Sequence, residues 1–135
     1  MKVYLSVPII FSRNAARAKM MARAIADSGH EVSSPWVLEP SEQTGTSPLD
    51  VFSRDSKGVE KSDAIVADVS APSTGVGMEV MAAHILRKKV VIVMRRGSVV
   101  SRMIAHMEPK ELIEFDEDED LYLSLRRALE GWSRS

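Results

Sequence analysis

The chain has 135 residues, of which 44% are hydrophobic and 27% are charged, so it is long enough for one globular domain and too apolar for a disordered chain. Its 18 lysines and arginines nearly balance 19 aspartates and glutamates, and this net charge of −1 argues against a nucleic-acid polymer as partner. The absence of cysteine excludes disulfides, thiol nucleophiles and cysteine-ligated metals. No apolar run approaches the roughly 20 residues of a membrane span, and no signal-peptide pattern opens the chain. We therefore expect a single cytoplasmic domain over residues 1–135 with no membrane partner.

Short β-branched runs alternate with segments of helical spacing along the whole chain. In chain order the expected strands are Lys2–Val7, His30–Ser34, Asp63–Val69, Val90–Met94 and Glu111–Phe115. The expected helices are Asn14–Ser28, Leu49–Lys61, Met78–Arg87, Ser98–Met107 and Leu121–Trp132, with a loop at Pro35–Pro48. This alternation predicts an α/β fold, a doubly wound parallel sheet of the flavodoxin or Rossmann type with helices on both faces. About five strands favour the order 2-1-3-4-5.

In such a sheet, ligands bind beyond the carboxyl ends of the strands, where the strand order reverses between the first and third strands. The loops at that place are Val7–Arg13 and Ser70–Glu79. The second loop carries Ser73, Gly75 and Gly77 directly before a helix. Glycines allow close backbone approach, the helix start offers free N–H groups, and the serine adds a hydroxyl. This segment can therefore hold a phosphate.

Two carboxylates are candidates for chemistry at the same place. Glu79 is expected in the first helical turn, where the helix dipole favours an ionised carboxylate. A carboxylate beside a phosphate is unfavourable for binding alone, but it can attack or stabilise a cationic carbon. Asp55 lies on the preceding helix, and paired carboxylates are the usual equipment for glycoside hydrolysis. From residue types alone, Glu79 is equally well explained as an ordinary acid at a helix start. Asp55 alone is more often a surface acid.

Metal chemistry has weaker candidates. The acidic run Glu114–Asp120 could hold a metal, but a solvated start of the last helix is the more common role of such a run. The three histidines, His30, His84 and His106, lack ligand spacing. We therefore expect no metal site.

The segment from Asp55 through Ser62–Ser70 to Pro72–Glu79 resembles the nucleoside 2-deoxyribosyltransferase family. Its spaced aspartate, Ala-Asp-apolar strand and Pro-Ser-x-Gly-Val-Gly-x-Glu turn are most similar to the hydrolase branch, the 2′-deoxynucleoside 5′-monophosphate N-glycosidases. Lys2–Leu5 and Ser101–Ile104 also match, so the resemblance extends over most of the chain to about residue 104.

The resemblance implies catalytic roles for three residues. Glu79 would be the nucleophile that attacks C1′ and forms a glycosyl-enzyme intermediate. Asp55 would be the acid that assists departure of the base, and Tyr4 would lie beside the nucleophile. Trp36, just past the second strand, can either stack on the base or cover the sheet edge.

The resemblance also implies how the phosphate is held. Ser73 and the backbone amides around Gly75 and Gly77 would cradle the 5′-phosphate. Ser101 would reach the phosphate of a partner subunit, and Met103 would close over the partner's base. A homodimer with a shared site is therefore expected.

The loop after the first strand departs from the hydrolase branch. That branch has Gly-Ser-Ile-Arg-Gly-Gly, whereas Pro8 stands here at the serine position and Ile10 at the arginine position. Arg13 or Arg17 would then have to replace the phosphate-binding arginine. The apolar wall of Pro8, Ile9 and Ile10 would favour a 2′-deoxy sugar, because it offers no partner to a hydroxyl.

These observations predict an N-glycosidase that hydrolyses a (deoxy)nucleoside 5′-monophosphate to the free base and (deoxy)ribose 5-phosphate. No cofactor is expected. One alternative is a nucleoside 2-deoxyribosyltransferase, in which a second base replaces water, although transferases of this family use unphosphorylated nucleosides. The other alternative is a non-catalytic nucleotide-binding sensor.

Overall fold

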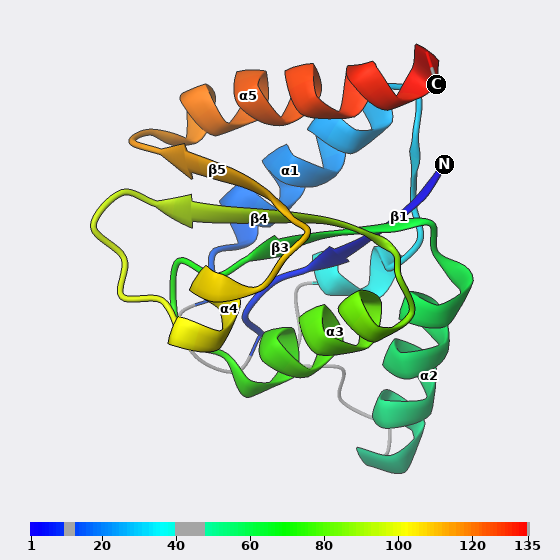
Figure 1. Ribbon diagram of the computed structural model, residues 1–135. Helices are drawn as coiled ribbons and strands as arrows, with labels where there is room; N and C mark the ends of the chain where they lie inside the picture. Colours follow the sequence, from blue (N-terminus) through cyan, green and yellow to red (C-terminus); the bar gives the residue numbers. More distant parts are fainter. Residues whose placement is uncertain (10–12, 40–47, 135) are drawn as a thin grey trace.

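A computed structural model describes residues 1–9, 13–39 and 48–134 of the chain (Figure 1). Its five parallel strands form one sheet in the order β2-β1-β3-β4-β5. The strands are β1 (Lys2–Ser6), β2 (Glu31–Val32), β3 (Ala64–Asp68), β4 (Lys89–Arg95) and β5 (Glu111–Phe115). The predicted fold class and strand order are confirmed.

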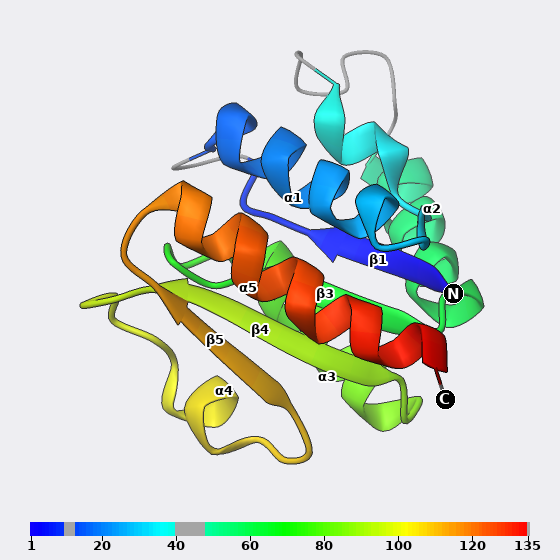
Figure 2. The same cartoon turned by 90° about the horizontal axis from the view of Figure 1, so that it is seen from above.

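Helices cover both faces of the sheet (Figure 2). The helices α1 (Ala15–Asp27) and α5 (Asp118–Glu130) lie on one face, and α2 (Pro48–Lys61) and α3 (Thr74–Ile85) lie on the other. A short helix α4 (Arg102–His106) follows β4, and single 3-10 turns form η1 (Pro35–Leu38) and η2 (Gly131–Arg134). Within the described ranges, no helix is long and apolar enough to cross a bilayer.

The central position of β1 decides which side chains reach the site. Successive side chains of a strand point to opposite faces. Val3 and Leu5 therefore pack with α1 and α5, whereas Tyr4 packs with the residues of α2 and α3. In the register with β3, Tyr4 lies opposite Ile65.

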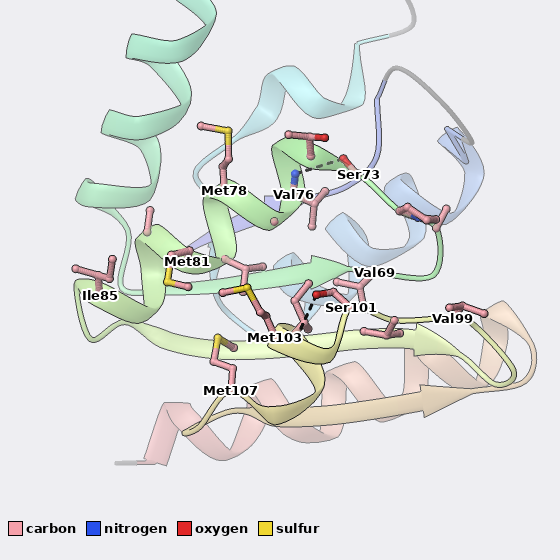
Figure 3. Close-up of a pocket in the computed structure, with 18 residues that line it drawn as sticks. Val69, Ser73, Val76, Met78, Met81, Ile85, Val99, Ser101, Met103 and Met107 are labelled. Carbon is pink, nitrogen blue, oxygen red and sulfur yellow. Dashed lines mark hydrogen bonds between the residues drawn. The ribbon is translucent and has the colours of Figure 1, made fainter.

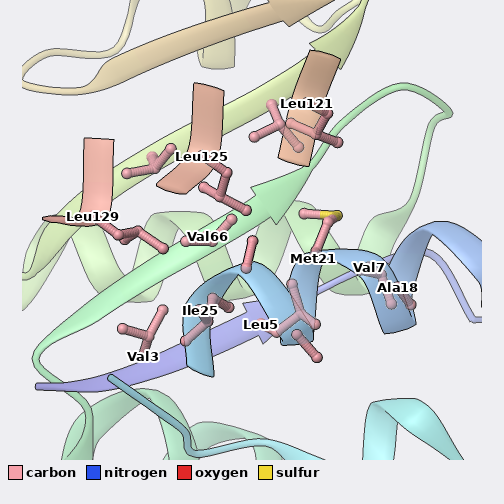
Figure 4. Packing of buried hydrophobic residues seen from close by; sticks show 14 of the residues in the cluster. Val3, Leu5, Val7, Ala18, Met21, Ile25, Val66, Leu121, Leu125 and Leu129 are labelled. Atoms are coloured by element: carbon pink, nitrogen blue, oxygen red, sulfur yellow. The ribbon is translucent and has the colours of Figure 1, made fainter. Parts of the chain in front are cut away.

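The face covered by α1 and α5 holds the larger part of the core (Figure 4). Leu121, Leu125 and Leu129 lie four residues apart on α5, so they share one side of the helix, and all three are fully buried. They pack with Met21 and Ile25 of α1 in the same cluster. Each such side chain contributes about 1.5–3 kcal/mol when it is fully buried, so this layer contributes much of the stability of the fold.

Several element boundaries differ from the sequence predictions, and three of the differences have a clear cause or bear on the site. The helix expected at Met78 begins at Thr74, because the Ser73 side chain caps it by accepting a hydrogen bond from the Val76 amide at 3.3 Å. The strand β2 has only two residues, because the Ser34 hydroxyl replaces the ladder by bonding both the N–H and the C=O of Leu5. The helix α4 covers only the middle of the expected Ser98–Met107 segment.

The acidic run Glu114–Asp120, which extends from the end of β5 into the first turn of α5, makes helix-start and surface contacts. Glu117 is the N-cap of α5 and forms a capping box with Asp120. Arg96 pairs with Glu114 at 3.4 Å and with Asp116 at 2.9 Å. In the described part of the chain, no three His, Asp or Glu residues are grouped to hold a metal ion.

Candidate active site

Glu79 is held at both of its carboxylate oxygens by hydroxyl groups from β1. The Tyr4 hydroxyl donates to Oε2, and the Ser6 hydroxyl donates to Oε1 over 2.7 Å. Both donors are about 1% exposed, and their strand positions two residues apart direct them to the same face. Sequence reasoning missed Ser6, although its spacing from Tyr4 was a usable signal.

The environment of Glu79 favours the protonated form of its carboxyl group more than water does for an ordinary glutamate. Burial raises its pKa from 4.5 to about 7, and the hydrogen bonds from Tyr4 and Ser6 oppose part of that rise. Burial and the Glu79 carboxylate also raise the pKa of Tyr4, so that phenol remains a hydrogen-bond donor at every relevant pH. Glu79 is therefore only partly ionised at neutral pH.

This finding corrects the expectation that a helix start would keep Glu79 ionised. The helix begins four residues earlier than predicted, and no acidic residue lies in its first turn. Glu79 lies in the second turn, where the effect of the helix dipole has already weakened. Burial then determines the direction of the pKa shift.

Asp55 lies on α2, on the same side of the sheet as Glu79, and its charge raises the pKa of Glu79. It pairs with Arg54, whose Nε lies 2.9 Å from Asp55 Oδ1. The Arg54 guanidinium stands over the Trp36 ring, 4.7 Å from its centroid. The Trp36 ring in turn meets the Tyr4 ring edge-on, with centroids 6.1 Å apart. The predicted acid, nucleophile, tyrosine and tryptophan therefore gather around one place.

A glycine on α2 allows this close packing. A Cβ added at Gly58 would lie 2.8 Å from Tyr4 Cε2 and 3.2 Å from Trp36 Cη2. Any other residue at this position would therefore have to displace one of the two rings. Nothing in the local sequence around Gly58 indicated this contact, because its partners come from distant parts of the chain.

Ser73, Gly75 and Gly77 lie together at the amino end of α3. Both glycines have helical backbone, and an added Cβ would meet nothing within 4 Å at either position. The backbone conformation therefore does not require glycine at either position. The absence of side chains there leaves the first turn of α3 exposed. Free N–H groups at an uncovered helix start suit an anion.

An apolar groove of about 830 Å³ runs between α3 and the segment containing α4 (Figure 3). Ser73 and Gly77 line it from α3, and Ser101 and Met103 line it from the other side. The Met103 side chain is 69% exposed. Glu79 is not among the lining residues, so the structure divides the predicted site residues between the groove and the buried carboxylate.

The segment after β1 is only partly described. Pro8 is buried, and Ile9 packs against the core cluster on the α1 and α5 face. Ile10, the third member of the predicted wall, lies outside the described residues. Arg13 donates to the backbone carbonyl of Val37 in η1 at 3.3 Å.

Arg17 is engaged in an ion-pair network. Its Nε lies 3.0 Å from Asp118 Oδ1, and its Nη1 lies 3.5 Å from Asp68 Oδ2. The guanidinium also stands over the Phe115 ring at 5.0 Å. These contacts tie α1 to β3 and α5 beneath the carboxyl edge of the sheet.

The structure brings together a parallel α/β sheet, two carboxylates on one of its faces and an open helix start beside its carboxyl edge. In this class of fold, ligands bind at that edge. The family model described as nucleoside 2-deoxyribosyltransferase matches residues 3–122. The chain belongs to this family.

Two curated relatives carry the name "Putative 2'-deoxynucleoside 5'-phosphate N-hydrolase 1". The protein from Thermofilum pendens is 39% identical over 110 residues, which cover 77% of this chain and 76% of that protein. The protein from Methanosarcina barkeri is 31% identical over 107 residues, covering 76% of this chain and 67% of the relative.

Two solved structures share the fold at low sequence identity. The CMP N-glycosidase from Clostridium botulinum superposes with a TM-score of 0.75 at 16% identity, covering 95% of this chain and 99% of that chain. The 2-deoxyribosyltransferase from Bacillus psychrosaccharolyticus has a TM-score of 0.59 at 23% identity, covering 93% and 96%.

Proposed function

We propose that this protein is an N-glycosidase that hydrolyses the N-glycosidic bond of a (deoxy)nucleoside 5′-monophosphate. The products would be a free base and (deoxy)ribose 5-phosphate. The observation that carries the proposal is the Glu79 carboxylate, partly buried and fixed by Tyr4 and Ser6 on the side of the sheet where Asp55 lies. The names of the curated relatives support the same reaction class.

In the first step, ionised Glu79 attacks C1′ of the sugar. The proton that Glu79 holds in the free protein passes to Asp55 when the substrate binds. The C1′–N bond then breaks, its electron pair goes to the base, and Asp55 supplies the proton that the departing base takes up. The transition state has oxocarbenium character, so the anionic carboxylate lowers its energy. Tyr4 and Ser6 hold the carboxylate in one orientation, which reduces the entropy lost on reaching the reactive geometry.

In the second step, water attacks C1′ of the glycosyl-enzyme ester. Asp55 takes a proton from this water, the ester bond breaks, and Glu79 leaves as a carboxylate. The sugar phosphate is released and both carboxyl groups return to their starting states. No metal or organic cofactor takes part in this scheme.

We assign the phosphate to the amino end of α3, where Ser73, Gly75 and Gly77 leave the helix start open. Ser101 lines the same groove as Ser73, on its opposite side. In a homodimer, the Ser101 and Met103 of one subunit would complete the site of the other.

The exposed apolar side chains of the groove favour a second copy of this chain as its binding partner. Ile85 is 68% exposed, Met78 is 58% exposed, and both line the groove with Met103. Contiguous exposed apolar side chains of this kind mark protein interfaces. Sedimentation of the wild type and of Ile85→Glu tests the dimer: the wild type should sediment as a dimer and the variant as a monomer.

The activity test uses a panel of ribo- and deoxyribonucleoside 5′-monophosphates and the matching nucleosides. Free bases are separated by chromatography, with Glu79→Gln as the inactive control. Base release from monophosphates that is absent in Glu79→Gln supports the proposal, and full activity in that variant refutes it. Base exchange upon addition of a competing free base would instead indicate a transferase. Nucleotide binding without turnover would indicate a sensor.

A further inference from the structure

Arg54 contacts both Asp55 and Trp36. On one side its Nε contacts Asp55 at 2.9 Å, and on the other its guanidinium stands over the Trp36 ring at 4.7 Å. Trp36 contacts Tyr4, whose hydroxyl donates to Glu79. A continuous series of contacts therefore runs from Asp55 through Arg54, Trp36 and Tyr4 to Glu79.

We propose that Arg54 is a positioning residue that couples the acid to the nucleophile, orienting Asp55 through their ion pair and placing a positive charge on the side of the sheet where Glu79 lies. This inference rests on the proposed function for its catalytic consequence. Its electrostatic part concerns the folded protein alone and can be measured without any substrate.

The surroundings of Arg54 restrict its motion. The side chains of Arg54 and Asp55 are only 23% and 24% exposed, so solvent screens their pair less than it screens a surface pair. The flat guanidinium on an aromatic face gains cation–π attraction, which a lysine ammonium would keep only in part. Gly58, one turn further along α2, lets the helix lie close enough to Tyr4 and Trp36 for these contacts.

The charge of Arg54 acts directly on the nucleophile. Among the described residues, four groups shift the pKa of Glu79. Tyr4 and Ser6 from β1 act through hydrogen bonds, and Arg54 and Asp55 from α2 act through their charges. Asp55 raises the pKa of Glu79 and Arg54 lowers it. Without Arg54, the negative charge of Asp55 would act on Glu79 unopposed, and the carboxyl would hold its proton to a higher pH.

The test compares Arg54→Gln and Arg54→Lys with Lys57→Gln. Lys57 is an exposed residue on the same helix, so its variant loses the same formal charge away from the site. The first measurement is a ¹³C NMR titration of the side-chain carboxyl groups, in which Glu79 is identified by the signal missing from Glu79→Gln. The second is the pH profile of kcat and kcat/KM for base release.

In Arg54→Gln we expect the Glu79 titration midpoint and the ascending limb of kcat/KM to move upward by about half a pH unit. We also expect kcat to fall roughly tenfold, since the acid loses its orientation. Arg54→Lys keeps the charge and loses the planar stack, so its midpoint should stay near the wild-type value while kcat falls. Lys57→Gln should match the wild type in both measurements.

A Glu79 midpoint in Arg54→Gln equal to that in Lys57→Gln overturns the inference, whether or not the protein is active. An unchanged kcat in both Arg54 variants overturns the positioning role of Arg54 toward Asp55. If the midpoint moves but no nucleotide is hydrolysed by the wild type, the proposed function fails and the electrostatic coupling stands. If Arg54→Gln does not fold, Arg54→Lys still decides the positioning role through kcat.

Discussion

Replacing Glu79 with glutamine should stabilise the protein, and the gain should depend on pH. Burial raises the pKa of Glu79 from 4.5 in an ordinary glutamate to about 7. One unit of pKa corresponds to about 1.36 kcal/mol, so this rise of about 2.5 units opposes folding by roughly 3 kcal/mol once the group is fully ionised. Glutamine has no charge to desolvate, and its amide oxygen can still accept from Tyr4 or Ser6.

The sign of the pH dependence follows from where the proton is bound. Below pH 4.5 the folded and unfolded chains both hold the Glu79 proton, so the wild type carries no ionisation penalty. Between pH 4.5 and about 7 the unfolded chain releases this proton while the folded chain keeps it, and stability decreases. Above about pH 8 both forms are ionised, and the full penalty of roughly 3 kcal/mol remains.

Urea unfolding of the wild type and Glu79→Gln at pH 4 and pH 8, at equal protein concentration, measures this difference. The gain in unfolding free energy should be about 3 kcal/mol larger at pH 8 than at pH 4. Glu60→Gln replaces an exposed glutamate on α2 and should show no such difference. Equal gains for Glu79→Gln at both pH values would refute the reasoning, because they would place the pKa of Glu79 near that of the unfolded chain.

Three further predictions concern Ser6 and Gly58, which lie around Glu79 and Tyr4, and Ser73 at the start of α3. Ser6→Ala removes a hydrogen bond that lowers the pKa of Glu79, so the ascending limb of the kcat/KM profile should move to higher pH, and an unmoved limb would contradict this role. Gly58→Ala places a methyl group 2.8 Å from a Tyr4 ring carbon, so kcat/KM should fall at least about tenfold despite the better helix propensity of alanine, as steady-state kinetics would show. Ser73→Ala removes the α3 cap and should lower the unfolding free energy by about 1 kcal/mol in urea titrations. The same variant should raise KM for monophosphates while leaving KM for the matching nucleosides unchanged.

The sequence predicted the strand order because the alternation of strands and helices is local information, and few topologies satisfy it. It failed at the start of α3, where two glycines in a helix turn looked like a loop. The cap at Ser73 and the packing of Val76 against the sheet outweigh their low helix propensity.

The residues that sequence reasoning missed share one property: their partners lie far away along the chain. Ser6 contacts Glu79 across 73 positions, and Gly58 lies against Tyr4 and Trp36. The Arg54–Asp55 neighbours were visible in the sequence, but only the fold places Trp36 under the guanidinium. Resemblance to a family identifies the candidate residues that its motif contains. The groups that change the pKa and the position of those residues become evident only from the folded structure.

The buried carboxylate illustrates how the two requirements on a nucleophile oppose each other. An exposed Glu79 would be ionised but strongly hydrated, whereas a buried Glu79 without donors would be protonated and unreactive near neutral pH. The two hydroxyls from β1 stabilise the anion without supplying a charge that would compete with the cationic transition state. Arg54 adds a positive charge, but its pairing with Asp55 balances that charge beside the site. A pKa of about 7 is therefore the expected result of a site that removes its nucleophile partly from water and still keeps a useful fraction of it ionised.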